Sequence, residues 1–305
     1  MKYREMDEVN PKKLLSNAWF ALFVLAIIYI ASQNIINALV GRFYPRLADT
    51  DWYTWGITVL SLIVLGLPVY LLLMNKIPNS PKGEVVKLKF SSLVVIFFIT
   101  ASAMYITNIA SSIITIFIAF LKGDTSLLNP AQEAILKSNY LVALIYACII
   151  APAVEEFIFR KVLLDKLRRF GDIPAILMTG IAFGLFHMNL SQFFYAAVLG
   201  FIFAYLTIRT NTVRYAVILH MIVNTISTSV APFVLKGNLI LSMILSSWVF
   251  VAILVGVILF ILYYKNIHIE KSEPLVRTKD YYVNAGAISY FLICLLMIVM
   301  ITVFY

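Results

Sequence analysis

Hydrophobic residues along this chain gather in long apolar runs that short polar segments separate. A run of about 20 residues is long enough to cross the ~30 Å hydrocarbon core of a bilayer as an α-helix. We expect nine such spans, or eight if one of the shorter runs does not cross. They are placed at residues 17–40, 55–74, 91–120, 140–160, 174–190, 192–208, 214–235, 239–264 and 285–305.

The third run is long enough to bend or continue outside the membrane, and the runs at 174–190 and 192–208 are short. Either short run is expected to be a tilted or partial span. Gly180 and Gly184 form a GxxxG pattern within the first of them, which favours close packing against a neighbouring helix. Aromatic residues near the ends of runs are expected to lie in the membrane interface; they are Trp52, Trp55, Tyr263 and Tyr264.

Basic residues between the apolar runs alternate with nearly neutral segments. With nine spans, all the basic segments fall on one side, which the positive-inside rule assigns to the cytoplasm. We therefore expect a multi-pass protein of the cell membrane with a cytoplasmic N-terminus, and a first run that is retained because it has no convincing cleavage site. The basic residues are Lys12, Lys13, Lys76, Lys82, Lys87, Lys89, Lys161, Lys166, Arg168, Arg169, Arg209, Arg214, Lys265, Lys271, Arg277 and Lys279.

Composition agrees with a membrane protein, since 62% of the 305 residues are hydrophobic, 13% are charged and the mean hydropathy is +0.94. Soluble domains are roughly half apolar and a quarter charged. The predicted fold is an all-α polytopic bundle in which residues 1–305 form one integral membrane domain, with the lipid bilayer as its partner. The net charge of +9 lies in loops without a basic block interleaved with aromatics, which argues against nucleic-acid binding. Cys148 and Cys294 are far apart in apolar runs, so neither a disulfide nor a cysteine metal site is expected.

Ionisable residues inside the apolar runs are few, and they cluster between positions 155 and 220. Because a charge within a bilayer is costly, such residues are candidates for function. They are Glu155, Glu156, Arg160, His187 and His220, with Asn224 as a polar neighbour.

The two adjacent glutamates are expected to have different roles. Glu156 and Arg160 are four residues apart, so they share a helix face and can form an ion pair. Glu155 points about 100° away and has Phe159, not a cation, four residues later. It is therefore free to act as a general base. The alternatives are a purely structural pair and an interfacial acid in water, and a bend at Pro152 would admit water or serve only packing.

The three helices bring their polar residues to comparable depth. Glu155 and His187 each lie about 20 Å from the basic end of their helix, and His220 lies roughly 10–16 Å from its own. We expect them to converge on a water-filled cavity that opens to the cytoplasm, because polar groups at depth need such a cavity. Taken singly, His187 is also explained as a satisfied structural residue, and His220 with Asn224 as an interhelical hydrogen bond.

Three short motifs carry a family resemblance. They read EEFIFR (EExxxR, Glu155 to Arg160), FGLFH (FxxxH, Phe183 to His187) and HMIVN (HxxxN, His220 to Asn224). In this order they resemble the CPBP family of intramembrane proteases, which includes type II CAAX prenyl endopeptidases, Abi proteins and bacteriocin-processing proteins. The motif-bearing protease core would be residues 140–235.

The resemblance implies an intramembrane endopeptidase that hydrolyses membrane-anchored proteins or peptides, such as prenylated or leader peptides. Glu155 would activate water, and His187 would position it. His220 and Asn224 would stabilise the oxyanion, while Glu156 pairs with Arg160 and Phe183 supports the site.

Metal use stays open from the sequence. Glu155, His187 and His220 are a permissible zinc set, and many proteins of the family are named metalloproteases. The chain has no HExxH motif, however, and a metal-free glutamate mechanism fits equally well. Two other functions remain: a non-catalytic immunity or scaffold protein on the same fold, and a proton or ion carrier. The absence of an inverted repeat in the sequence counts against the carrier.

Overall fold

A computed structural model describes residues 10–81, 83–123, 130–269 and 276–304 of the chain. Within these residues the ordered elements are all helical, which confirms the all-α prediction. The long helices are α1 (Pro11–Phe43), α5 (Phe90–Lys122), α10 (Asp172–Phe186), α11 (Leu190–Thr210), α12 (Arg214–Leu235), α13 (Leu239–Tyr263) and α14 (Ala285–Phe304). Short helices α2 (Pro45–Ala48), α6 (Pro130–Lys137), η6 (Tyr264–Asn266) and η7 (Thr278–Tyr281) lie between them.

Two further helices are continuous but contain wide π-helical turns. Residues 53–74 comprise α3 (Tyr53–Val59), the π segment η2 (Leu60–Gly66) and α4 (Leu67–Met74). Residues 140–170 comprise α7 (Tyr140–Ile145), the π segment η3 (Tyr146–Ile150), α8 (Ala151–Glu156), the π segment η4 (Phe157–Leu164), α9 (Asp165–Leu167) and the 3₁₀ turn η5 (Arg168–Phe170). The glutamate doublet therefore lies in a short α-helical stretch between two π segments, a feature that is frequent at functional sites.

Seven helices in the described part of the chain are long and apolar enough to cross a membrane. This finding confirms a multi-pass protein, while the count of nine spans stays a prediction. The first helix begins at Pro11, six residues before the expected start, because the side chain of Asn10 caps it by accepting from the Lys12 backbone N–H. The helix with the glutamates runs ten residues beyond the predicted end, to Phe170.

Helix α10 is too short for a full crossing. Its 15 residues span about 22 Å, less than the ~30 Å of a hydrocarbon core. The prediction that one of the two short runs is a partial span therefore fits α10, whereas α11, with 21 residues, is among the seven candidates.

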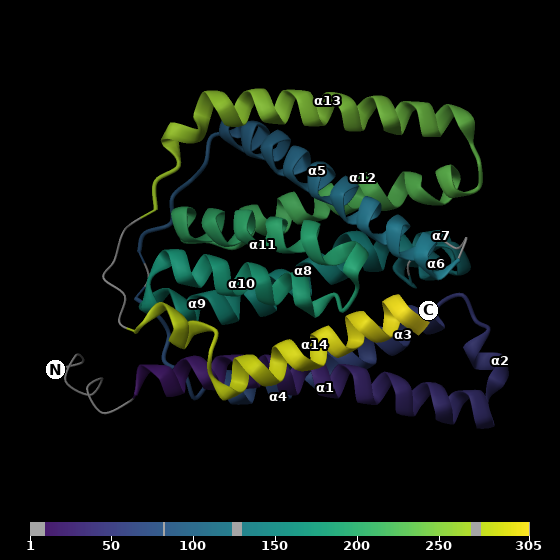
Figure 1. The fold of residues 1–305 in the computed structure, drawn as a ribbon, viewed down its shortest axis with the longest axis horizontal. Coiled ribbons are helices and arrows are strands. Elements are labelled where there is room, and N and C mark those ends of the chain that lie inside the picture. Colours follow the sequence, from purple (N-terminus) through teal and green to yellow (C-terminus); the bar gives the residue numbers. More distant parts are fainter. Residues whose placement is uncertain (1–9, 82, 124–129, 270–275, 305) are drawn as a thin grey trace.

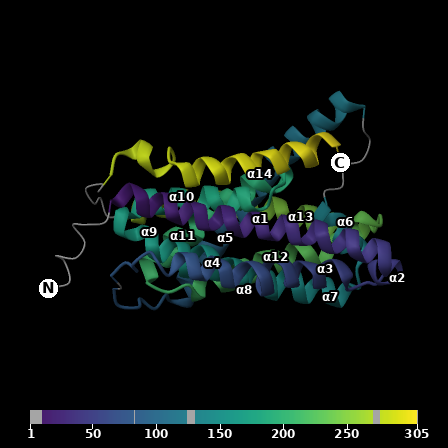
Figure 2. The ribbon, with the colours of Figure 1, turned by 90° about the horizontal axis from the view of Figure 1, so that it is seen from below.

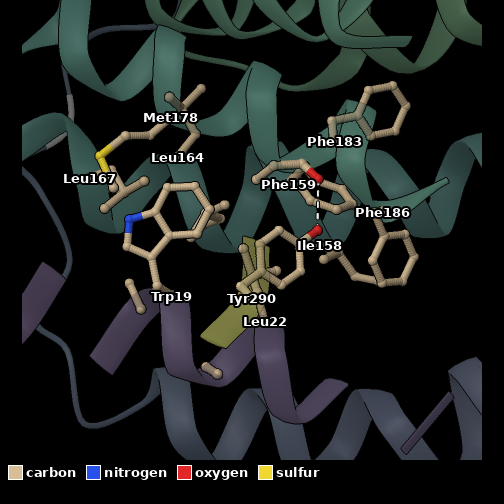
Figure 3. Close-up of a cluster of buried hydrophobic side chains, with 14 of the residues drawn as sticks. Trp19, Leu22, Ile158, Phe159, Leu164, Leu167, Met178, Phe183, Phe186 and Tyr290 are labelled. Carbon is tan, nitrogen blue, oxygen red and sulfur yellow. Dashed lines mark hydrogen bonds between the residues drawn. The ribbon is translucent and has the colours of Figure 1, made fainter. Parts of the chain in front are cut away.

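The helices run in roughly the same direction and form a layered bundle (Figures 1 and 2). Helices α5 and α13 pack together along one edge, and α1 packs with α14 and α4 along the opposite edge. The motif-bearing helices α8, α10 and α12 lie between these edges, together with α11. Figure 3 shows how the central core is built, with Trp19, Leu22 and Tyr290 from α1 and α14 facing Ile158, Phe159 and Phe186.

Loops that carry the predicted basic segments meet at one end of the bundle. Backbone N–H groups of Ser80 and Val86 donate to the carbonyls of Asp165 and Thr210, each at 3.0 Å. The Lys12 ammonium lies 3.2 Å from the carboxylate of Asp280. These contacts agree with the predicted placement of the basic loops on one side, while the cytoplasmic assignment of that side stays a prediction.

Helices α10 and α11 form a hairpin held by glycine. A Cβ on Gly200 would lie 2.7 Å from the Cα of Gly180, and one on Gly184 would lie 2.8 Å from the Cβ of Ala197. The expectation of close packing at the GxxxG pattern is thus met, and the partner is the very next helix. The turn between them passes through Met188, which has a positive φ of 50°. His187 is therefore fixed at the tip of a rigid hairpin.

Candidate active site

The core of the site is a buried ion pair. Glu156 and Arg160 are fully buried, and Nη1 of Arg160 donates to Oε1 of Glu156 at 2.9 Å. The spacing of four residues places them together even though a π segment begins between them. The guanidinium carbon of Arg160 also lies 4.4 Å from the ring centroid of Phe183 and 5.5 Å from that of Phe203. Aromatic faces and one carboxylate thus stabilise the cation in the interior.

His220 joins this pair from α12. Its Nδ1 lies 2.9 Å from the same Oε1 of Glu156. An ionised carboxylate can only accept a hydrogen bond, so Nδ1 carries the hydrogen. The opposite nitrogen, Nε2, lies 3.7 Å from Oε2 of Glu155. His220 therefore bridges the two glutamates, and Glu156 fixes the orientation of its ring.

Glu155 is the accessible member of the doublet. Its side chain is 18% exposed, whereas that of Glu156 is 0% exposed. Arg160 hydrogen-bonds to Glu156 and not to Glu155. The structure thus separates one carboxylate that holds the cation from one that is partly exposed and does not bond to it.

His187 and His220 share one aromatic neighbour. The ring centroid of Phe183 lies 4.9 Å from that of His187 and 5.8 Å from that of His220, in edge-on contacts. Nδ1 of His187 lies 2.9 Å from the carbonyl oxygen of Phe183, one turn earlier. Since a carbonyl only accepts, Nδ1 carries the hydrogen and the lone pair is on Nε2. The structure therefore brings His187 and His220 to Phe183, and His220 in turn lies beside Glu155.

Asn224 has a partner that the sequence did not suggest. Its amide nitrogen donates to the carbonyl of Ala147 at 2.9 Å. The N–H of Ala151 donates to the carbonyl of Tyr146, five residues earlier, as in a π-helix. In the same pattern, the N–H of residue 152 would donate to the carbonyl of Ala147. That residue is Pro152, which has no N–H. Asn224 thus satisfies the carbonyl that Pro152 leaves free, and it ties α12 to the distorted helix beside the glutamates.

A metal site does not fit this arrangement. Among the described residues, no three His, Cys, Asp or Glu side chains gather in a way that would hold a metal ion. Both ring nitrogens of His220 face carboxylates, and Nδ1 of His187 is committed to a carbonyl. The zinc alternative stays a prediction without support from the described side-chain positions.

Three tyrosines near Glu155 were not predicted. Tyr29 of α1, Tyr146 of η3 and Tyr195 of α11 all lie within electrostatic reach of its carboxylate. Trp55 stacks on Tyr146 with ring centroids 4.7 Å apart, and its place in the interfacial belt stays a prediction. Tyrosine and tryptophan are common in apolar spans, so their presence in the sequence does not mark them as site residues. The only sequence signal was that Gln33, a polar residue, lies one turn from Tyr29.

Comparisons with known proteins agree with the motifs. The family model described as "Type II CAAX prenyl endopeptidase Rce1-like" matches residues 137–226. The chain is also 26% identical over 215 residues to a protein of Bacillus subtilis (strain 168) named "Putative membrane peptidase YdiL". That alignment covers 68% of this chain and 86% of the relative. No solved structure matches the chain significantly.

The family match begins just before α7 and ends within α12, so it contains all three motifs. Helices α1, α5, α13 and α14 lie outside it. Residues 137–226 are thus similar to the Rce1-like family and the chain to a membrane peptidase, in agreement with the resemblance to the CPBP family of membrane proteases that the three motifs carry.

Proposed function

We propose that the protein is a membrane endopeptidase in which Glu155 activates the attacking water. The observation that carries this proposal is that the two adjacent glutamates have different partners and different exposure. Glu156 holds Arg160 and His220, while Glu155 is partly exposed and faces Nε2 of His220 at 3.7 Å. The substrate is a peptide segment of a membrane-anchored protein, such as a prenylated or leader peptide, and the site opens to the cytoplasm.

In the first step, Glu155 takes a proton from water, and the water oxygen attacks the scissile carbonyl carbon. The lone pair on Nε2 of His187 accepts the second hydrogen of that water and orients it. The electron pair of the carbonyl moves to its oxygen, which gives a tetrahedral oxyanion. In the second step the C–N bond breaks, and Glu155 returns its proton to the amine that leaves.

Two donors serve the oxyanion in this proposal. His220 donates from Nε2, while the carboxylate of Glu156 accepts from Nδ1 and holds the ring in place. Asn224 donates through its second amide hydrogen, since Ala147 takes only one of the two. Both donors are on one face of α12, four residues apart.

The test is cleavage by the purified protein in vesicles of a panel of quenched fluorescent peptides. The panel contains a farnesylated peptide and the same peptide anchored by a transmembrane helix. Glu155→Gln is expected to lower kcat by about 10²–10⁴-fold, the usual contribution of a general base. Glu133→Gln, which changes a glutamate paired with Lys137 on α6, is the matched control and retains activity.

Two outcomes would contradict the proposal. Cleavage that is unchanged in Glu155→Gln removes the assigned base. Biological protection that survives Glu155→Ala and His187→Ala together, with no cleavage by the wild type, favours the immunity or scaffold function instead.

A further inference from the structure

Phe203 of α11 is a fully buried aromatic residue beside the candidate active site but outside the three motifs. Its ring centroid lies 5.4 Å from that of His220, with an interplanar angle of 34°. The guanidinium carbon of Arg160 lies 5.5 Å from the same centroid. Arg160 and His220 are the two side chains that donate to Oε1 of Glu156. One ring therefore contacts both donors to the same carboxylate oxygen.

The glycine contact within the α10–α11 hairpin explains how this ring reaches the site. Gly200 approaches the backbone of Gly180 too closely for a Cβ. Phe183 follows Gly180 by three residues, and Phe203 follows Gly200 by three. Because the two helices of a hairpin run in opposite directions, the phenylalanines lie on opposite sides of this contact, each about 4.5 Å along its helix. Both rings contact the buried guanidinium of Arg160.

The hydrogen bond to Glu156 leaves the His220 ring one free rotation. It fixes the position of Nδ1, but the ring can still turn about the line that joins Nδ1 to Oε1. Such a turn displaces Nε2, the nitrogen that lies 3.7 Å from Glu155. Phe183 contacts the imidazole edge-on at 89°, whereas Phe203 lies closer to parallel with it, at 34°. In a close-packed interior, this rotation drives the imidazole into the Phe203 ring, which therefore opposes it.

We propose that Phe203 is a positioning residue that holds the imidazole of His220 so that Nε2 points at the oxyanion. The proposal rests on the proposed peptidase function, in which His220 is an oxyanion donor. In this role Phe203 acts through His220 and touches no reacting atom. Its contact with Arg160 strengthens the arrangement, because attraction between the cation and the ring keeps the shared carboxylate of Glu156 in place.

The test compares Phe203→Leu, which removes the ring, with Phe203→Tyr, which keeps it. With the quenched peptides, Phe203→Leu is expected to lower kcat about tenfold and leave KM within about twofold, because the oxyanion exists only in the transition state. Removal of a whole oxyanion donor costs more, roughly 10²–10³-fold. Phe203→Tyr stays within about threefold of the wild-type kcat, since the ring remains.

Phe201→Leu is the matched control for loss of an aromatic ring from the same hairpin. Phe201 is also on α11, and its ring packs against Gly180. Its kcat is expected to stay within about twofold of the wild type, because the imidazole keeps its neighbour. If Phe203→Leu does not fold, Phe203→Met takes its place, since methionine is flexible enough to fill the space without a planar ring. A wild-type kcat in the variant without the ring overturns the inference.

A double-mutant cycle separates positioning from packing. If Phe203 acts through His220, then Phe203→Leu changes kcat by less than about twofold in the His220→Gln background, where the imidazole is already gone. A role in packing alone repeats the tenfold loss in that background. Such a repeat overturns the inference.

Failure of the positioning role and failure of the peptidase function give different results. If the wild type cleaves neither peptide, the proposed function fails, and NMR of the three ¹⁵N-labelled histidines decides the inference alone. The spectrum of His220→Gln identifies the signal of His220. A held ring gives an Nδ1–H signal that is protected from exchange with water in the wild type and in Phe203→Tyr, and that is lost in Phe203→Leu. Equal protection in Phe203→Leu, or no protected signal in the wild type, overturns the inference.

Discussion

At the scale of single residues, Glu156 organises the site. Its Oε1 atom accepts from both Arg160 and His220 at 2.9 Å, and the side chain is fully buried. Charges buried in this way are tolerated only as a set, since removal of one partner leaves the other uncompensated. The neighbouring Glu155 does not hydrogen-bond to Arg160. The division between the two glutamates therefore depends on which one faces Arg160.

Neutralising Glu156 is expected to destabilise the protein. Glu156→Gln leaves the Arg160 cation buried without the carboxylate that it hydrogen-bonds, which costs about 3–5 kcal/mol. Adding Arg160→Met removes that cation, so the double variant should be more stable than Glu156→Gln alone. Denaturant unfolding in detergent measures both, and a double variant less stable than the single one would contradict this account.

The contact between Asn224 and Ala147 can be tested by a double-mutant cycle. Asn224→Ala leaves the carbonyl of Ala147 without a donor, at a cost of about 1 kcal/mol. Pro152→Ala restores a backbone N–H for that carbonyl. In the Pro152→Ala background, Asn224→Ala should therefore cost less, with a coupling energy of about 0.5–1 kcal/mol in unfolding experiments. Additive costs would show that Pro152 is not the reason for the contact.

At the scale of elements, the α10–α11 hairpin sets the position of His187. The hairpin depends on the approach of Gly200 to the backbone of Gly180, with no room for a Cβ. A backbone atom cannot move aside as a side-chain end can. Any group added there pushes the two helices apart and displaces the tip, where His187 contacts Phe183.

Gly200→Ala is expected to impair both folding and activity. Overpacking at this contact costs about 1–3 kcal/mol, and the displaced tip lowers kcat for any peptide that the wild type cleaves. Gly41→Ala on α1 is the control, because a Cβ there meets nothing within 4 Å. Thermal unfolding and cleavage assays on both variants check this, and equal behaviour of the two would refute it.

At the scale of the whole molecule, polar contacts at the basic end hold the last helix in place. The segment before α14 contacts the start of α1, where the Lys12 ammonium lies 3.2 Å from the Asp280 carboxylate. Within that segment, Arg277 lies 3.3 Å from the same carboxylate. The indole N–H of Trp19 donates to the carbonyl of Tyr281 at 2.8 Å. This hydrogen bond joins two segments more than 260 residues apart, beside the central core that contains Trp19.

This junction is expected to weaken in acid. The Lys12 ammonium, with help from Arg277, lowers the pKa of Asp280 below its ordinary value of 3.8. A lowered pKa in the folded state gives stability that is present at neutral pH and is lost as the pH falls through that folded value. Wild type should therefore be more stable than Asp280→Asn at pH 7, and the difference should shrink in acid. Asp49→Asn, at an exposed position, is the control, and thermal unfolding across pH measures all three.

The sequence predicted the bounds of the helices better than it predicted the contacts within the candidate site. Residues 214–235 match α12 at both ends, and the bounds of most other spans are within a few residues, because apolar runs and their caps are local features. The start of α1 and the end of the glutamate helix were missed, since helices continue through charged residues beyond the apolar run. The stack of Trp55 on Tyr146 was missed because it joins two helices that are far apart in the sequence.

The sequence by itself determined the helical membrane character, the order of the three motifs and the pairing of Glu156 with Arg160, because hydropathy and a spacing of four act within one helix. Only the tertiary structure decided that His220 bridges both glutamates and that Asn224 serves the carbonyl beside Pro152. These contacts join helices far apart in the chain. Side-chain direction across such contacts depends on how helices pack, and no local pattern encodes that packing.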